Sequence, residues 1–179
     1  MSKYFEQFPK MLYDIKGNNK YKLVPDIFRR IKIKNKLKNN VTFLEKYDVE
    51  DGEKPETVAY RIYGSTHLFW VICMVNNIEN PYYDWPLSNL QFENYMQDKY
   101  TQPDAVHHYE KLQSSGPQIG AGPEDYSHML ECDSTDAGAG AVTNAEYEQR
   151  LLNKKRQIKV LAPSYLDNFI SEFKRLIRQ

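Results

Sequence analysis

Few residues of this chain have the type and spacing that chemistry at a site requires. His107 and His108 are adjacent, and adjacent side chains on a strand point to opposite faces, so we do not expect them to share one metal ion. Cys73 lies in an apolar stretch, where a thiol usually packs as a small hydrophobic group. Cys132 is flanked by two carboxylates, which disfavour the thiolate that a nucleophile needs. The sequence therefore predicts no metal site, no cofactor and no enzymatic activity.

Glycine is concentrated in one segment, and its spacing does not indicate a phosphate site. Five of the eight glycines lie within residues 113–142, together with Pro117 and Pro123. This composition predicts a long surface loop. The short Gly-Ala repeats lack both the spacing of a dinucleotide-binding loop and a preceding strand.

Charge is unevenly distributed along a chain whose net charge is zero. Residues 1–60 carry a net charge of +4, residues 61–145 carry −8, and residues 146–179 carry +4. A general polyanion binder would not have an acidic middle. The basic run at 20–40 has neither a series of aromatic stacking platforms nor a known nucleic-acid-binding motif, so we expect no nucleic-acid partner. The pattern suits several differently charged protein partners, or a neighbouring copy of the chain.

The remaining composition indicates a chain that binds other proteins inside a reducing compartment. No apolar run reaches the roughly 18 residues of a membrane span, so no membrane contact is expected. Two cysteines give no disulfide framework, which favours the cytoplasm. The 14 tyrosines and 8 phenylalanines suit surfaces that become buried against partners.

The local patterns predict an α+β fold. Apolar and polar residues alternate over 42–49, as in a half-buried strand, and Asp51-Gly52 then predicts a turn. A stretch that is apolar on nearly all sides, 66–76, predicts a buried helix. Thr143 and Glu146 have capping-box spacing, and Ser164 with Asp167 repeats it. The other expected elements are helices at 55–63, 88–100 and 143–152, a strand at 156–162, and an amphipathic helix that runs to the end of the chain.

The N-terminal segment, residues 1–19, leaves two interpretations open. It is either a strand or turn folded onto its own domain, or an aromatic anchor that inserts into a partner. We expect interfaces outside the compact part of the chain, because large aromatic residues and arginine dominate binding energy. The predicted interface residues are Tyr4, Phe5, Phe8, Leu12, Phe28, Arg29, Arg30, Tyr82, Tyr83 and Trp85.

The segment from Phe43 to Leu87 resembles a LysM module, a family with a βααβ fold. The residues that follow its pattern, in order, are Tyr47, Val49, Gly52, Glu53, Val58, Ala59, Tyr63 and Gly64. LysM modules bind chitin or peptidoglycan through loops next to the two strands. Here the aromatic residues 82–85 replace the Pro-Gly turn before the last strand, so we expect no useful affinity for glycans.

Nearly the whole chain, apart from 113–142, resembles the baseplate wedge protein 53 family of T-even-type contractile-tailed bacteriophages. The resemblance lies in DIFRR at 26–30, IYG to YYDW at 62–85, and the segment from TNAEYEQ to YLDNF at 143–169. It implies a small βααβ LysM-like domain embedded in an extended chain, with an N-terminal arm, a long loop and a C-terminal amphipathic helix. The expected division is 1–41, 42–88, 89–142 and 143–179.

The same resemblance implies a structural subunit of the virion that clamps neighbouring wedges during baseplate assembly in the host cytoplasm. Its implied partners are the large wedge scaffold subunits and a sheath-initiator-like wedge protein, with six copies around the tail axis. The alternative function is a LysM-type module that binds peptidoglycan or chitin.

Overall fold

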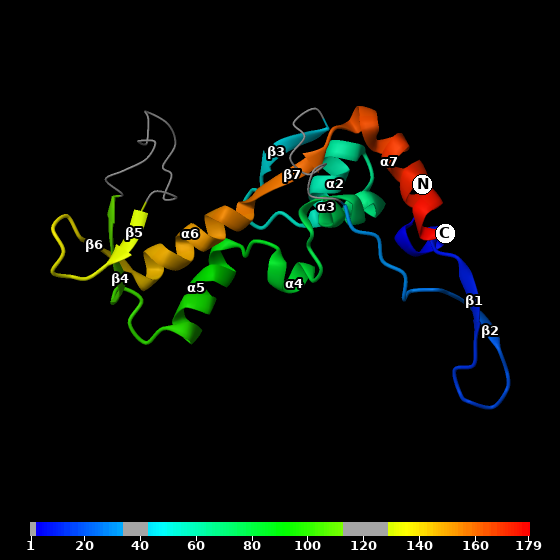
Figure 1. Cartoon of the computed structure of the whole chain (residues 1–179), viewed down its shortest axis with the longest axis horizontal. Helices are drawn as coiled ribbons and strands as arrows, with labels where there is room; N and C mark the ends of the chain where they lie inside the picture. Colours follow the sequence, from blue (N-terminus) through cyan, green and yellow to red (C-terminus); the bar gives the residue numbers. More distant parts are fainter. Residues whose placement is uncertain (1–2, 34–42, 113–128) are drawn as a thin grey trace. The chain divides into compact units, whose positions relative to one another are not determined.

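The computed structural model describes residues 3–33, 43–112 and 129–179. The chain divides into two compact units (Figure 1). Unit 1 consists of residues 1–86 and 155–179, and unit 2 consists of residues 87–154. Both units contain helices and strands, which confirms the predicted α+β class.

Unit 1 is built from segments at both ends of the sequence. The N-terminal segment forms a short 3-10 helix and a two-stranded antiparallel hairpin. A second antiparallel pair, β3 with β7, packs with α2 and α3. The elements are η1 (Tyr4–Gln7), β1 (Lys10–Tyr13), β2 (Lys22–Pro25), β3 (Leu44–Asp48), α2 (Pro55–Tyr63), η2 (Thr66–Leu68), α3 (Phe69–Asn76), α4 (Pro81–Asp84), β7 (Gln157–Leu161), η4 (Pro163–Tyr165) and α7 (Leu166–Ile177).

The partner strand of β3 corrects one expectation. The βααβ unit was expected to close within 42–88, but residues 81–84 form the short helix α4. The closing strand is β7, paired with β3 from Leu44↔Leu161 to Asp48↔Gln157. Ile158 and Val160 alternate along β7 and are both buried. A strand at 156–162 was predictable from this alternation, but its pairing across more than 100 residues was not.

Helices α2 and α3 begin and end at residues whose local conformation favours a helix terminus. Pro55 occupies the first turn of α2, where its missing N–H costs nothing. Gly64 ends the helix with a φ of 70°, a left-handed conformation that glycine adopts without steric cost. The single helix expected over 66–76 is instead a 3-10 turn followed by α3, which ends at Asn77 with a φ of 59°.

One hydrophobic core holds unit 1 together. Val58, Ala59, Val71 and Ile72 have no measurable exposure. α7 contributes Phe173 and Ile177 from its apolar face, as the amphipathic pattern predicts. The capping expected from Ser164 is not present, because residues 163–165 form a 3-10 turn and α7 has no side-chain cap.

Unit 2 contains a three-stranded antiparallel sheet in the order β5-β4-β6. Strand β5 and most of β6 lie in the segment expected to be a loop, so that expectation is wrong for residues 129–132 and 140–142; residues 113–128 lie outside the described residues. The capping hydrogen bond predicted at Thr143 is present, and Ser88, for which no cap was predicted, forms a capping box at the start of α5. The elements are α5 (Asn89–Lys99), β4 (Val106–Leu112), β5 (Met129–Cys132), β6 (Gly140–Thr143) and α6 (Asn144–Arg156), whose last residues lead into unit 1.

Candidate interaction surfaces

The residues of the LysM-like pattern hold the fold of unit 1 in place. The Tyr47 hydroxyl donates a hydrogen bond to the Glu53 carboxylate at 2.9 Å. The indole N–H of Trp85 donates to the backbone carbonyl of Glu53 at 2.7 Å. Gly52 has a φ of 69° in the turn after β3. These positions therefore have structural roles that need no bound sugar.

At the edge of β7 that faces away from β3, two side chains form hydrogen bonds with the backbone N–H and C=O groups, in the place of another strand. The Tyr63 hydroxyl donates to the carbonyl of Leu161 and accepts from its N–H, at 3.0 and 3.1 Å. The Asn76 amide donates to the carbonyl of Lys159 and accepts from its N–H, at 2.7 and 2.8 Å. Burial raises the pKa of Tyr63 to about 12, so this hydroxyl keeps its proton throughout the physiological range. The two side chains cover an edge that would otherwise pair with another chain.

Replacement of Asn76 by alanine is expected to lower the free energy of unfolding by about 1–3 kcal/mol, because it leaves two backbone groups of Lys159 without their side-chain partners. Urea unfolding followed by tryptophan fluorescence measures the loss. Asn77→Gly is the control, since glycine accepts the positive φ at that position. Equal stability of Asn76→Ala and Asn77→Gly would contradict the assignment.

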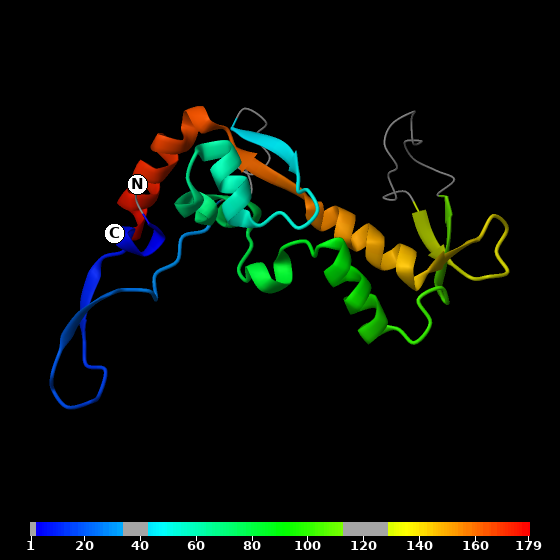
Figure 2. The ribbon, with the colours of Figure 1, turned by 180° about the vertical axis from the view of Figure 1, so that it is seen from behind.

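The N-terminal segment packs onto its own unit. The Tyr4 ring lies 5.5 Å from Trp70 and 5.8 Å from Phe173, measured between ring centroids. Phe8 is 6% exposed and lies 6.4 Å from Phe173. Both views place η1 beside α7 (Figures 1 and 2). Of the two interpretations left open by the sequence, the structure supports the one in which the arm folds onto its own domain.

The ten predicted interface residues separate into buried and exposed groups. Phe8 and Trp85 belong to the core and have little surface to offer a partner. Tyr4 is half-buried. The exposed hydrophobic members are Phe5, Leu12, Phe28, Tyr82 and Tyr83, of which Tyr82 is 90% and Phe28 is 81% exposed.

Tyr82 and Tyr83 project from a rigid support. The Asn80 side chain accepts the N–H of Tyr82 at 3.1 Å and so caps α4. The carboxylate of Asp84 accepts the N–H groups of Glu79 and Asn80 at 3.1 and 3.0 Å, and these bonds lower the pKa of Asp84. Because the backbone is fixed, little conformational entropy is lost when the two exposed rings are covered.

Arg29 and Arg30 lie in the segment 26–33, which crosses unit 1 without regular secondary structure beyond a turn. Arg29 donates to the Asp26 carboxylate at 2.9 Å and to the carbonyl of Ile177, at the end of α7, at 3.1 Å. Arg30 forms an ion pair with Glu79. The two predicted interface arginines therefore also hold the crossing segment to the rest of unit 1.

The β1–β2 hairpin has an exposed apolar surface that the sequence analysis identified only at Leu12. We define the hairpin surface as Leu12, Tyr13, Ile15, Tyr21 and Leu23, which are 48–66% exposed. It includes both faces of the two-stranded hairpin, because Leu12 lies opposite Leu23 on one face and Tyr13 lies opposite Lys22 on the other. The Asp14 carboxylate accepts the N–H groups of Lys16 and Asn19, and this orders the turn. The spacing of aromatic and aliphatic residues on both sides of Gly17-Asn18-Asn19 was the available signal.

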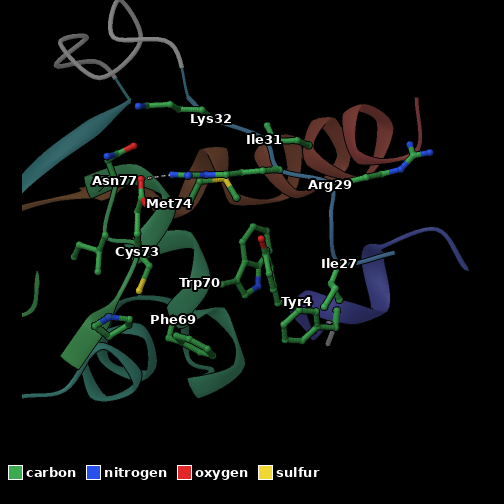
Figure 3. A pocket seen from close by; sticks show the side chains of 15 residues that line it. Tyr4, Ile27, Arg29, Ile31, Lys32, Phe69, Trp70, Cys73, Met74 and Asn77 are labelled. Carbon is green, nitrogen blue, oxygen red and sulfur yellow. Dashed lines mark hydrogen bonds and ion pairs between the residues drawn. The ribbon is translucent and has the colours of Figure 1, made fainter. Parts of the chain in front are cut away.

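A cavity of about 510 Å³ lies between the crossing segment and α3 (Figure 3). Its apolar wall includes Phe69, Trp70 and Met74, and Arg29 and Lys32 come from the crossing segment. Figure 3 shows the rings of Tyr4 and Trp70 against one another beside this space. Glu79 also lines the cavity and pairs with Arg30, while Arg29 pairs with Asp26, so the two arginines here already have carboxylate partners.

The residues first considered for chemistry form no reactive centre in the described part of the chain. Burial raises the pKa of Cys73 to about 11, so its thiol is protonated and unreactive near neutral pH. His107 and His108 differ from the expectation of opposite faces: a β-bulge between Val106 and His108 brings their Nδ1 atoms to 2.9 Å. Within the described residues no cluster of three or more potential ligands could hold a metal ion.

Comparison with known proteins identifies the family. The family model for base plate wedge protein 53 matches residues 4–176. The chain belongs to this family. It is 26% identical over 171 residues to the baseplate wedge protein gp53 of Enterobacteria phage T4, and the match covers 86% of this chain and 84% of that protein.

As a member of the base plate wedge protein 53 family, the chain is a structural protein of the virion, in the baseplate of a contractile tail. Such a protein interacts with other baseplate components. None of the helices in the described ranges is long and apolar enough to cross a membrane. The exposed aromatic surfaces of unit 1 are thus candidates for contacts within the baseplate.

Proposed function

We propose that this protein joins neighbouring wedges of the baseplate, and that Phe28, Tyr82, Tyr83 and the hairpin surface are its contact points. The single observation that carries this proposal is the presence of large exposed aromatic rings on ordered supports in unit 1. Aromatic side chains on fixed backbones are typical of binding hot spots. Contacts at several points on one chain also strengthen one another through effective concentration.

The proposed partners are the large wedge scaffold subunits and the sheath-initiator-like wedge protein, with six copies of this chain around the tail axis. In this proposal the chain assembles into wedges in the host cytoplasm and performs no enzymatic step. Family membership supports the baseplate setting. The proposed joining of neighbouring wedges is tested by the incorporation of variants into reconstituted wedges.

Replacement of Tyr82 and Tyr83 by alanine is expected to weaken incorporation into reconstituted wedges by about tenfold or more, since truncation of a hot-spot residue typically costs at least about 2 kcal/mol of binding. Co-sedimentation with wedges assembled without this chain measures incorporation. Tyr60→Ala is the matched control, because Tyr60 lies on α2 of the same unit and is 64% exposed. Incorporation of the double variant at the level of Tyr60→Ala would refute the role of α4.

We further propose that the LysM-like part of unit 1 is a scaffold and not a glycan site. Support comes from the structural roles of Tyr47, Glu53 and Trp85. Calorimetric titration with chitin or peptidoglycan fragments is expected to show no binding tighter than about 1 mM, or roughly −4 kcal/mol. Micromolar affinity would revive the glycan-binding alternative.

A further inference from the structure

The two units of the chain carry opposite charge. Unit 1 contains 20 Lys and Arg residues against 13 Asp and Glu, a net charge of +7, and unit 2 contains 4 against 11, a net charge of −7. These equal and opposite net charges are not apparent from consecutive sequence segments, because unit 1 consists of two segments from opposite ends of the chain. A molecule with two oppositely charged parts is electrostatically complementary to a second copy of itself.

The cations of unit 2 are largely neutralised within that unit. Lys99 pairs with Glu148 at 2.6 Å, Lys111 with Asp136 at 2.7 Å, and Arg150 with Glu110 at 2.8 Å. Burial raises the pKa of Glu148, but hydrogen bonds from Lys99 and Tyr100 outweigh burial and give a net lowering, so this carboxylate is charged at neutral pH. In the described part of unit 2, the acids that join no ion pair are all exposed.

Several of these acids lie on the sheet of unit 2. Glu131 stands directly opposite Glu110 in the β4–β5 ladder, and like charges in that position destabilise a sheet. Asp133 follows β5, and Asp104 precedes β4; among the described residues no ion pair includes either of them or Glu131. We define the acidic sheet surface as Asp104, Glu131 and Asp133, which are all exposed.

The hairpin surface of unit 1 has the matching character. Lys10, Lys16, Lys20 and Lys22 lie along the same hairpin, are exposed, and join no ion pair of the described residues. The acid within the hairpin, Asp14, is already bonded to backbone N–H groups of the turn. The hairpin thus presents apolar side chains among uncompensated positive charges, on a backbone that the turn holds in place.

We propose that the hairpin surface of one copy docks on the acidic sheet surface of a second copy. The two surfaces are different, so the contact is heterologous and can repeat from copy to copy in a head-to-tail manner. Strands of four residues cannot bury the area of a standard stable interface, which makes the contact weak and transient. Charge supplies much of the attraction, so salt must weaken it.

Sedimentation velocity on the purified full-length protein tests this proposal without any other baseplate protein, so its outcome is independent of wedge incorporation. Concentration-dependent association is expected at about 0.1 M salt, and its loss is expected at about 1 M salt, where the Debye length falls from roughly 10 Å to 3 Å. A protein that stays monomeric at low salt over the whole accessible concentration range would overturn the proposal.

Charge reversal on each surface locates the contact. Lys20→Glu with Lys22→Glu, or Glu131→Lys with Asp133→Lys, is expected to weaken association by about tenfold, since several exposed pairs change from attraction to repulsion. An equimolar mixture of the two double variants is expected to regain association, because each reversed surface then meets a reversed partner. Circular dichroism checks that both variants remain folded; all four positions are exposed.

Lys46→Glu with Lys54→Glu is the matched control, because it changes the net charge of unit 1 equally at exposed positions outside the hairpin. This control is expected to associate like the unaltered protein. A loss equal to that of the hairpin variant would show that overall charge and not the hairpin is responsible, and would overturn the assignment. Failure of the mixture to regain association would overturn it as well.

Discussion

Replacement of Phe173 by alanine is expected to lower the free energy of unfolding of unit 1 by about 3–5 kcal/mol. The Phe173 side chain is 3% exposed, and its ring lies 4.7 Å from Trp70, between centroids. It also contacts Tyr4 and Phe8 of the N-terminal segment. Its removal therefore leaves a cavity where α3, α7 and η1 meet. Urea unfolding followed by the fluorescence of Trp70, in a Trp85→Phe background, reports directly on this cluster.

Leu176→Ala is the matched control for Phe173→Ala, because Leu176 lies on the same helix and is 37% exposed. It is expected to cost less than about 1 kcal/mol. A similarly small loss for Phe173→Ala would mean that η1 does not pack on α7, and the N-terminal segment would then be available as an anchor for a partner. The structure instead predicts that deletion of residues 1–14 unfolds or strongly destabilises unit 1.

Replacement of Leu68 by alanine is expected to cost about 2–5 kcal/mol, the range for a large aliphatic side chain lost from a core. Leu68 ends η2 and is 7% exposed, next to α3. Thermal unfolding by differential scanning calorimetry measures the change. Leu23→Ala on the hairpin, where the side chain is 60% exposed, is expected to change stability by less than about 0.5 kcal/mol.

A loss below about 0.5 kcal/mol for Leu68→Ala would show that this residue does not belong to the core. The same pair of variants separates stability from assembly. Leu68→Ala is expected to act on folding, whereas Leu23→Ala is expected to act only where the hairpin surface meets another chain. A destabilising effect of Leu23→Ala in the isolated protein would mean that the hairpin packs within unit 1.

Local sequence patterns predicted most helices and strands because their causes are local. The start of α2 at Pro55 and its end at Gly64 follow from the conformations that proline and glycine favour. The start of α6 after Thr143 follows from a side-chain cap on the N–H of Glu146. β7 was visible as an alternation of buried Ile158 and Val160. None of these features requires knowledge of distant residues.

The exposure of the predicted contact residues could not be predicted locally, because it depends on which distant parts of the chain pack against them. Phe8 and Trp85 have the same sequence character as Phe28 and Tyr82, yet the first two are buried and the last two are exposed. The Trp85 indole finds an acceptor on Glu53, and Phe8 finds Phe173 near the end of the chain. Neither contact can be predicted from the neighbouring residues in the sequence.

Residue type and short spacing are enough to predict the α+β class, the resemblance to the baseplate family, and the start and end of α2 at Pro55 and Gly64. The pairing of β3 with β7, the hydrogen bonds of Tyr63 and Asn76 to the edge of β7, and the division of charge into one basic and one acidic unit depend on contacts between distant parts of the chain. The physical reason is that the backbone hydrogen bonds between two strands are nearly the same for any side chains. A strand takes the partner that buries its apolar face, wherever in the chain that partner lies.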